Sequence, residues 1–379
     1  MNYKYHLALI LATLTACVSF GSNIAKYDKN MAVAKEKATD SMIWIDGRQL
    51  PIEGRAFNDV EHYYDRLPSN VTAKVNGGVR SLKRHTAGMQ FRFSTDSKKL
   101  ILKWVPMFGA LSMDHMPSTG VSGIDVYKYD GKVNRWVYVK TGRIHSNKGG
   151  TLSLSWTPGT PCLVNLPLYN GIKSFSLGIE KGSSIVPLPP RKSGVKKPVV
   201  FYGTSITQGG CASRPGLSFV NIVGRDLDVP IVNLGFSGSG VMELEMAEHL
   251  AKIDASCYVL DCLWNMGMTS DGPRHGRNVD VNYEPFIRRL RELKPSTPII
   301  MAEACDVFVN KRDSRGDFIR ALYKRLKSEG WKNLVYLDKS NMYRPDIEGT
   351  VDGVHANDRG MLDLAKAFGG AVKEAIFRK

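Results

Sequence analysis

Ser205 follows a run of apolar residues and lies among glycines, in the segment YGTSITQGG (202–210). A serine hydroxyl is a poor nucleophile unless a base accepts its proton, and the base works best when a carboxylate holds its tautomer. Near the C-terminus, the segment DGVHAND contains Asp352 and His355. We therefore predict that Ser205 is a nucleophile, that His355 is its base and that Asp352 orients the base. The structural alternative for Ser205 is an ordinary glycine-rich turn.

Two alternative roles for the serine segment fail on spacing. A phosphate-binding loop would end in Lys-Ser or Lys-Thr, or would carry the G-x-G-x-x-G pattern, and GTSITQGG has neither. The segment also lacks the G-x-S-x-G elbow, which argues against an ordinary α/β-hydrolase.

The tetrahedral intermediate of acyl transfer needs preorganised donors for its oxyanion, and losing one donor typically costs about 100- to 1,000-fold in rate. The backbone N–H groups of Ser205 and Gly238, with the side-chain amide of Asn265, would supply three donors. Two structural alternatives stay open. Gly238 could be only a turn glycine at positive φ, with Gly235 as its rival, and Asn265 could cap its own loop.

Two further segments are candidates for substrate contact. Trp264, beside Asn265, could stack on a sugar ring or belong to the core. The loop 112–120 contains Asp114 and His115, and it could reach over the active site or serve as an interdomain or surface segment. No histidines show H-x-x-x-H or H-x-H spacing, so we expect no metal, and no other cofactor is indicated.

The second half of the chain must position these residues, and its rhythm is strand, loop, helix. Five short apolar runs alternate with segments whose apolar residues fall on one helical face; the runs are 198–202, 230–234, 257–263, 298–302 and 334–337. This pattern predicts a three-layer α/β/α domain with a five-stranded parallel sheet, over 197–379. Sites in such folds lie at the carboxyl ends of the strands, where the candidate residues stand.

The first half alternates polar and apolar residues at strand period, as in MQFRFST (89–95) and SFSLGIE (174–180). Short runs separated by Gly, Asn and Asp predict an antiparallel β-sandwich over 40–190. The segment Val186 to Pro198, rich in Pro and Lys, is expected to be the linker between the two domains.

The first 21 residues are typical of a signal peptide, with Lys4 before a short apolar run. Within it, LTAC (14–17) is similar to a bacterial lipobox, in which Cys17 would carry a lipid anchor; cleavage near SFGS is the alternative. We expect an exported protein of a bacterium, either periplasmic or anchored to the membrane as a lipoprotein. No second apolar run of about 18 residues follows.

The net charge and the cysteine spacing bear on whether the protein binds nucleic acid or zinc or forms disulfides. The net charge of +16 is dispersed, without a dense basic block, so we expect a solvated surface and no nucleic acid partner. The six cysteines show no C-x-x-C spacing, which indicates neither a zinc site nor a disulfide framework. Cys257, Cys262 and Cys305 stand in strand-like runs and are expected to be buried thiols.

The order of these blocks resembles that of the SGNH hydrolases, the GDSL-like esterase and acylhydrolase superfamily. Its signature Ser, Gly, Asn and His would be Ser205, Gly238, Asn265 and His355. The first half resembles the branch in which a β-sandwich with a G-x-D-L-Y motif precedes the hydrolase. Here the motif reads GIDVY (123–127). Other similar stretches are DRLP (65–68), TAGMQFRFSTDS (86–97), LPLYNGI (166–172) and YGTSITQGGCASRPG (202–216).

The resemblance implies a bacterial, generally exported enzyme of a group often classed with carbohydrate esterases. It also leads us to expect proline where Trp264 and Ala356 stand, and these departures bear on substrate preference. We therefore predict an exported serine esterase that acts on short O-acyl groups, such as acetate, of a glycan or small-molecule ester. The alternatives are a lysophospholipase or thioesterase, and a non-catalytic glycan-binding protein. The oligomeric state is not indicated.

Overall fold

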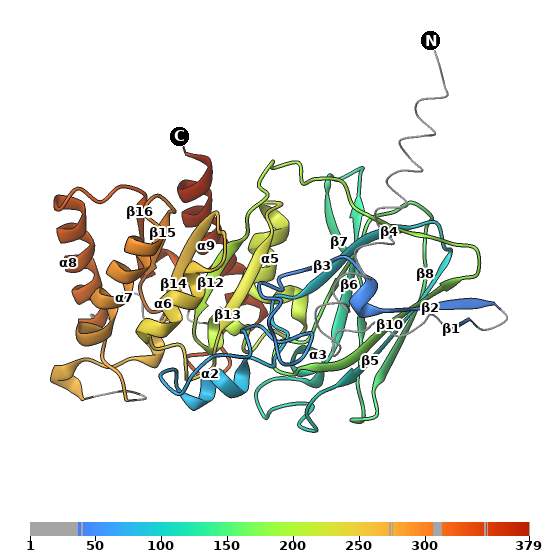
Figure 1. Cartoon of the computed structure of the whole chain (residues 1–379), viewed down its shortest axis with the longest axis horizontal. Helices are drawn as coiled ribbons and strands as arrows, with labels where there is room; N and C mark the ends of the chain where they lie inside the picture. The colour runs from blue at the N-terminus through green and yellow to red at the C-terminus, as the bar shows by residue number, and fades with distance from the viewer. Residues whose placement is uncertain are drawn as a thin grey trace, which may run out of the picture.

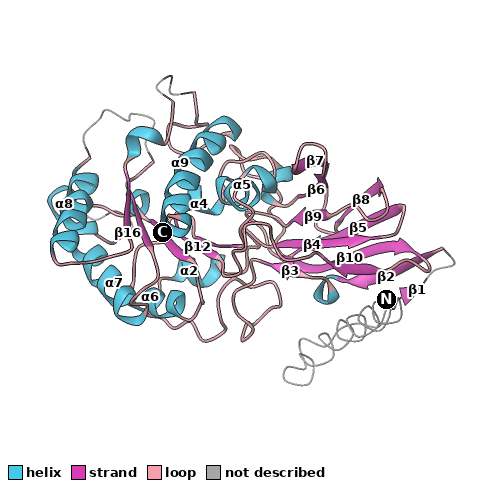
Figure 2. Ribbon diagram, turned by 90° about the horizontal axis from the view of Figure 1, so that it is seen from above, coloured by secondary structure: helices cyan, strands magenta, loops and turns pink. Residues whose placement is uncertain are grey.

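The computed structural model describes residues 37–38, 41–272, 274, 276–305, 313–344, 346 and 348–378. The predicted signal peptide, Cys17 included, lies outside these residues. An N-terminal part built of antiparallel strands and a C-terminal part of alternating strands and helices lie side by side (Figures 1 and 2).

The N-terminal part contains two antiparallel sheets. Their strand orders are β1-β2-β10-β5-β8 and β11-β4-β9-β6-β7, with β3 beside β4. The strands are β1 (Lys37–Ala38), β2 (Met42–Asp46), β3 (Ile52–Glu53), β4 (Gln90–Thr95), β5 (Lys99–Pro106), β6 (Ile124–Asp130), β7 (Arg135–Gly142), β8 (Gly150–Ser155), β9 (Cys162–Asn165), β10 (Ile172–Glu180) and β11 (Ile185–Pro187). The short helices are η2 (Gly47–Gln49), α2 (Gly77–Leu82) and α3 (Ser118–Val121).

The two sheets share one apolar core, as the alternating pattern predicts. Phe91 and Phe93 of β4, in the second sheet, are fully buried with Leu177 of β10, in the first. The rings of Phe91 and Phe175 join the sheets with their centroids 4.6 Å apart. Burial of apolar surface, worth roughly 25 cal/mol per Å², is the main force that holds the sheets together. The predicted antiparallel sandwich is confirmed.

The C-terminal part contains one parallel sheet of five strands in the order β13-β12-β14-β15-β16. The strands are β12 (Val199–Gly203), β13 (Ile231–Gly235), β14 (Cys257–Asp261), β15 (Ile299–Ala302) and β16 (Leu334–Leu337). The α-helices are α4 (Ser205–Gln208), α5 (Phe219–Asp226), α6 (Leu244–Ala251), α7 (Val279–Leu293), α8 (Ser314–Ser328) and α9 (Asp358–Phe377). The 3₁₀ turns are η3 (Pro215–Leu217), η4 (Leu263–Asn265), η5 (Thr269–Asp271) and η6 (Lys339–Asn341).

Helices cover both faces of the parallel sheet. Successive residues of β12 point to opposite faces, so Val200 packs in the core beneath α6, α7 and α8, whereas Phe201 packs beneath α5 and α9. A strand buried on both faces must be apolar throughout, which explains the uninterrupted run in this strand. The predicted three-layer fold is confirmed, and the order of its strands is the flavodoxin-like one.

The carboxyl ends of the neighbouring strands β13, β12 and β14 lie in register. Gly203 at the end of β12 is paired with Gly235 of β13 on one side and with Asp261 of β14 on the other. The loops that carry Ser205, Gly238 and Asn265 therefore leave the sheet at one place, side by side.

The segment expected to be a linker is held on both sides. Arg191 forms ion pairs with Glu53 of β3 and, at 3.1 Å, with Asp228 beyond α5. The hydroxyl of Ser193 donates a hydrogen bond of 2.6 Å to the carbonyl oxygen of Asp228. The connection therefore fixes the two parts against each other rather than letting them swing.

Two further sequence-based expectations concern cysteines and membranes. Within the described ranges, Cys162, Cys211, Cys257 and Cys262 are buried free thiols, and Cys305 is buried as well. The expectation of buried thiols is thus confirmed for the three in strand-like runs. Among the helices that the structure describes, none combines the length and the apolar character needed to cross a bilayer.

Candidate active site

Ser205 begins the short helix α4, directly after β12, and only 8% of it is exposed. Thr204 caps this helix: its hydroxyl accepts from the N–H of Ile206 at 3.3 Å, while its own N–H donates to the hydroxyl of Thr207 at 3.2 Å. A reciprocal pair of this kind fixes the first turn of a helix. The capped turn holds the Ser205 hydroxyl at the carboxyl end of strand β12.

Glycines let the backbone pack closely beneath this turn. A Cβ atom on Gly203 would lie 2.5 Å from the carbonyl oxygen of Asp261, and one on Gly240 would lie 2.0 Å from the carbonyl oxygen of Gly203. These contacts are with backbone atoms, which cannot swing aside as a side chain can. Gly203 and Gly240 therefore allow the chain segments at the ends of β12, β13 and β14 to approach one another closely.

Ser205, His355 and Asp352 form a continuous hydrogen-bonded chain. The Ser205 Oγ lies 3.0 Å from Nε2 of His355, and Nδ1 of the same ring lies 2.7 Å from Oδ2 of Asp352. The other carboxylate oxygen, Oδ1, accepts from the N–H of His355 at 2.7 Å and from that of Val354 at 3.0 Å. The acidic residue thus binds both the ring and the backbone of the histidine, which fixes the ring's orientation.

The electrostatics keep the Asp352 carboxylate ionised beside the imidazole of His355. Partial burial on its own would raise the pKa of Asp352, but hydrogen bonds from the His355 ring and from two N–H groups outweigh it and hold the pKa below its usual value. An ionised Asp352 accepts a hydrogen bond from Nδ1–H of His355, so Nε2 presents its lone pair to the Ser205 hydroxyl. This arrangement can take a proton from the serine.

One main-chain hydrogen bond ties the histidine loop to the serine loop, and another closes the histidine loop on itself. The N–H of Cys211 donates to the carbonyl oxygen of Ala356 at 2.8 Å, and the N–H of Val351 donates to that of His355 at 2.9 Å. Ala356, where the family resemblance led us to expect proline, is fully buried. Its carbonyl group keeps the base close to the nucleophile.

The predicted oxyanion donors lie on the loops that follow the paired strands β12, β13 and β14. Gly238 has a φ of 62°, which favours glycine. In the described part of the chain, the backbone N–H groups of Ser205 and Gly238 have no protein acceptor. The amide of Asn265 donates to the carbonyl oxygens of Phe236 and Gly240, at 3.2 and 3.3 Å. Asn265 therefore braces the loop of Gly238, and its role as a third donor stays a prediction.

Trp264 is held by contacts within the protein. Its indole N–H donates to the carbonyl oxygen of Cys305, and its ring lies 5.1 Å from the guanidinium carbon of Arg274 and 5.2 Å from that of Arg315. The ring also packs against both cores of the α/β part. These contacts favour the structural interpretation, and stacking on a sugar stays untested.

The loop 112–120 of the N-terminal part does reach the site. The ring of His115 packs edge-on against that of His355, with centroids 5.3 Å apart. Asp114 is exposed, and its side chain makes no hydrogen bond or ion pair within the described residues. The structure thus brings His115 to the catalytic base but leaves Asp114 outside the cluster.

Several residues around Ser205 were missed by sequence-based reasoning. The Tyr169 hydroxyl, from the N-terminal part, donates to the carbonyl oxygen of Ser205 at 2.8 Å. The amide of Gln208 donates to Nδ1 of His85 at 2.9 Å, and burial with the nearby charge of Arg66 lowers the pKa of that histidine to about 3. His85 is therefore a neutral acceptor. These residues stand in or beside the stretches that resemble the family.

Arg66, in the stretch DRLP, joins the two parts of the chain. Its side chain is fully buried and donates to the carbonyl oxygens of Asn233 at 3.0 Å and of Gly235 at 2.7 Å. Burial lowers the pKa of Arg66 to about 9, which leaves it charged at neutral pH. An arginine from the N-terminal part thus ties down the end of β13, where the Gly238 loop begins.

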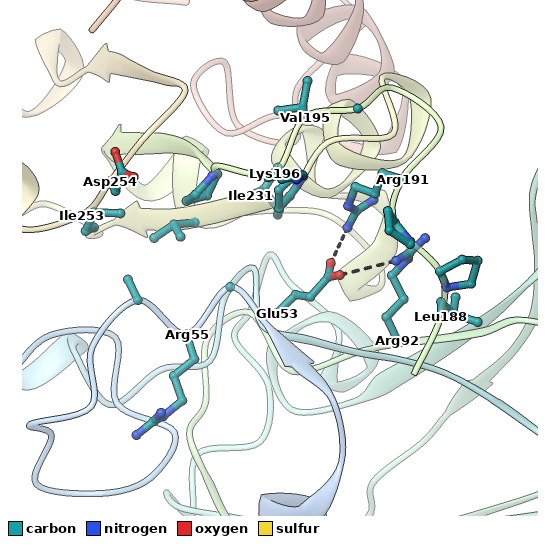
Figure 3. Close-up of a pocket in the computed structure, with 18 of the residues that line it drawn as sticks. Glu53, Arg55, Arg92, Leu188, Arg191, Val195, Lys196, Ile231, Ile253 and Asp254 are labelled. Carbon is teal, nitrogen blue, oxygen red and sulfur yellow. Dashed lines mark hydrogen bonds and ion pairs between the residues drawn. The ribbon is translucent and has the colours of Figure 1, made fainter. Parts of the chain in front are cut away.

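A cavity of about 650 Å³ lies between the two parts, away from this site (Figure 3). It is lined by Glu53, Arg191 and Lys196, among others, and by Ile231, with which β13 begins. It therefore opens at the amino ends of the strands, whereas Ser205 lies at their carboxyl ends. Because sites in such folds lie at the carboxyl ends of the strands, this cavity is not the catalytic site despite its volume.

Two family models match the chain. The model described as the GDSL-like lipase/acylhydrolase family matches residues 196–373, and the model described as the N-terminus of SGNH-hydrolase-type esterases, with the GxDLY motif, matches residues 42–185. A search of curated proteins gives no significant match.

Solved structures of the same architecture include a protein described as a GDSL-like lipase from Bacteroides ovatus. It is 27% identical, with a TM-score of 0.76 over 89% of this chain and 99% of that one. A salicylyl-acyltransferase of a tetracycline biosynthetic pathway is 16% identical, with a TM-score of 0.64 over 89% and 91%. A family two carbohydrate esterase from Clostridium thermocellum, solved with cellohexaose, is 11% identical, with a TM-score of 0.53 over 76% and 92%.

The last two show the fold alone, whereas the family models and the Bacteroides structure agree on the type of enzyme. Because the two models match the two parts of the chain in order, the chain belongs to the GDSL-like lipase and acylhydrolase family, in the branch with a GxDLY N-terminal domain, and is an ester hydrolase.

Proposed function

We propose that this protein is an exported serine esterase that removes short acyl groups, chiefly acetyl, from hydroxyl groups of carbohydrates. The observation that carries the mechanism is the hydrogen-bonded chain from Ser205 through His355 to Asp352, with links of 3.0 and 2.7 Å. The first link has the length at which the Ser205 proton can pass to His355, and the second holds the ring in place.

In the first half-reaction, Ser205 Oγ attacks the ester carbonyl while Nε2 of His355 takes its proton. The ring then gives this proton to the leaving alcohol, which releases the deacylated sugar. Water attacks the acyl-enzyme with the same base, and the acid departs. Asp352 stays ionised throughout and stabilises the imidazolium that forms twice in each cycle.

The N–H groups of Ser205 and Gly238 stabilise the oxyanion of both tetrahedral intermediates. They belong to different loops, which the paired strand ends Gly203 and Gly235 hold side by side. Asn265 contributes in the same place, either as a third donor or by holding the Gly238 loop in position.

Support for a carbohydrate substrate comes from the solved relatives. Two proteins of this fold are family two carbohydrate esterases, one of them solved with cellohexaose. The side chain of His355 is 25% exposed and that of Asp352 is 38% exposed, so the leaving-group side of the site is open to a bulky alcohol. An open rim of this kind suits an acyl group carried on a polymer.

Export is proposed from the first 21 residues, with Cys17 as the lipid-modified residue. Fractionation of cells that produce the wild type and Cys17→Ala, together with mass spectrometry of the mature N-terminus, tests both points. A lipid mass on Cys17 supports anchoring, and cleavage near SFGS without lipid supports simple secretion. An uncleaved chain in the cytoplasm would contradict export.

Hydrolysis of p-nitrophenyl acetate and butyrate tests the catalytic assignment. Ser205→Ala and His355→Ala should each lose at least about 1,000-fold in kcat/KM while keeping the circular dichroism of the wild type. Ser153→Ala and His145→Ala, exposed positions in the N-terminal part, are matched controls and should keep full activity. A Ser205→Ala enzyme with unchanged activity would refute the nucleophile.

The substrate class is tested by acid release from acetylated polysaccharides, lysophospholipids and acyl thioesters. Acetate release from a polysaccharide, together with preference for the acetyl over the butyryl ester, would support the proposal. Faster hydrolysis of long-chain lysophospholipids or thioesters would replace it with the corresponding alternative. Binding of a glycan array by a protein inactive on every ester would favour the non-catalytic alternative.

A further inference from the structure

Three side chains of types that bind metals, from three distant segments, lie together around the proposed general base. They are His115 of the loop 112–120, Cys211 of the segment after α4, and His355; one ligand atom of each lies within 4.8 Å of the other two. The sequence-based expectation of no metal rested on local spacing, and local spacing does not report such a cluster.

Each of the three presents a suitable atom. Nδ1 of His355 is bound to Asp352, so its ligand atom is Nε2, which lies 3.0 Å from Ser205 Oγ. Cys211 is buried and free of disulfides, and its backbone is fixed by the hydrogen bond to Ala356. The ring of His115 is exposed, beside His355. A histidine whose other nitrogen is bound to a carboxylate is the usual arrangement around protein-bound zinc.

The geometry requires only a small contraction. Ligand atoms at about 2.0 to 2.3 Å from a tetrahedral zinc ion lie roughly 3.3 to 3.8 Å from one another. The present separations, up to 4.8 Å, need to shorten by about 1 Å. His115 is the exposed member, so it can make most of this movement while the two residues beneath it stay in place.

We propose that His115, Cys211 and His355 form a zinc site and that zinc bound there reversibly inhibits the esterase. The Cys211 thiol gives its proton to solvent and binds zinc as thiolate, and the Nε2 lone pair of His355 binds the ion instead of the Ser205 proton. Water completes the coordination. The site itself needs no catalysis; only the inhibition rests on the proposed function.

The ligand set selects the metal. A thiolate with two imidazoles suits zinc and other borderline or soft ions, whereas magnesium and calcium prefer oxygen. A second cluster, of Glu61, His62 and Asp65, differs in this respect. Its Glu61 already pairs with Arg84 at 2.6 Å and with Lys83 at 3.5 Å, and these two positive charges disfavour the binding of a metal cation there.

Binding is tested first without reference to activity, in Ser205→Ala titrated with Co²⁺ as a spectroscopic substitute for zinc. We expect one ion per chain, tetrahedral cobalt absorption and a thiolate-to-cobalt charge-transfer band that zinc abolishes. The band should vanish in Ser205→Ala/Cys211→Ala. In Ser205→Ala/His115→Ala, the affinity for Co²⁺ should fall at least tenfold. No charge-transfer band, or a band that survives loss of Cys211, would overturn the site.

Inhibition is then measured as kcat/KM against buffered free Zn²⁺, each variant being normalised to its own zinc-free rate. The wild type should lose at least tenfold at micromolar zinc and recover with EDTA. His115→Ala and Cys211→Ala should need at least tenfold more zinc, whereas the matched control His62→Ala should respond like the wild type. Equal zinc sensitivity of the wild type, His115→Ala and Cys211→Ala would refute the proposal.

The two measurements separate the two hypotheses. A cobalt band in a protein that hydrolyses no ester would leave the metal site standing and refute the esterase. Ester hydrolysis without the band would do the reverse.

Discussion

Asp125 of strand β6 and Arg214 of the serine-bearing part form an ion pair at 2.8 Å across the boundary between the two parts. The Asp125 side chain is fully buried, and its carboxylate also accepts from the N–H of Gly216 at 2.9 Å and from the amide of Asn165 at 2.8 Å. Tyr127 completes the contact, since its hydroxyl accepts from Arg214 at 2.5 Å. The acidic residue and tyrosine of the GxDLY motif thus hold the segment that follows the nucleophile.

Arg214→Ala should lower the free energy of unfolding by about 3 kcal/mol, because it leaves a buried carboxylate without its counter-ion. Urea denaturation followed by circular dichroism measures this, with the exposed Arg143→Ala as control. The double variant with Asp125→Asn should lose less than the sum of the two single losses. Additive losses would mean that the two side chains do not interact in solution.

Asp352→Asn should lower kcat about 100-fold or more with little change in KM, since the amide cannot hold His355 in the required tautomer. The pKa of Asp352 lies below its usual value, so the carboxylate stays charged at every pH above about 5. We therefore expect the ratio of wild-type to variant kcat to stay constant from pH 6 to 9. A ratio that falls toward one across this range would argue against the assigned role.

Asn265→Ala should lower kcat by about 10- to 1,000-fold and also destabilise the fold, because the side chain braces the Gly238 loop. Stopped assays of kcat and KM, combined with thermal unfolding, separate the two effects. If the variant is less stable but turns over at the wild-type rate, Asn265 is only a brace.

Gly240→Ala should unfold the site or the domain, because its Cβ would lie 2.0 Å from the carbonyl oxygen of Gly203. Gly370→Ala is the matched control on helix α9. Nothing lies within 4 Å of its added Cβ, and alanine there should stabilise the protein by about 1 kcal/mol. Equal thermal stability of the two variants would show that the strand ends have room to move.

Asp261 predicts a pH dependence of stability. Burial raises the pKa of Asp261 to about 7, although the Thr207 hydroxyl donates to it at 2.7 Å. Between pH 3.8 and about 7, the Asp261 carboxyl is therefore protonated in the folded state and ionised in the unfolded state. The free energy of unfolding falls as pH rises through that window.

Asp261→Asn removes this titration. Relative to the wild type, the variant should gain about 3 kcal/mol of unfolding free energy between pH 5 and pH 8. Denaturant unfolding at both values measures the gain. A constant difference between the two proteins would mean that Asp261 is ionised in the folded state throughout.

Features that depend on the local sequence pattern could be predicted from the sequence. The buried run of β12 is apolar at every position because both faces are covered, and the serine after it stands where such a strand ends. The order of Ser205, Asp352 and His355 was sufficient to propose the chain that the structure assembles. The alternation in β4 likewise predicted a strand of the sandwich.

Contacts between distant segments left no such pattern. Tyr169 and His85 reach the serine loop from the sandwich, and nothing in the spacing of either residue reports the partner it meets. For Asn265, the sequence offered an oxyanion donor or a loop cap, and only the structure shows its two bonds to the Gly238 loop. The composition of the segment Val186 to Pro198 predicted a linker, but not the ion pairs by which Arg191 joins it to both parts.

The separation of Ser205 and His355 by 150 positions has a consequence during synthesis. When a ribosome has made the sandwich and β12, the nucleophile and its neighbour Tyr169 are already present, but the base is not. At 5 to 20 residues per second, the base follows roughly 8 to 30 seconds later. Nascent chains stalled in this interval should hydrolyse no ester, so the first turnover would report that translation has passed His355.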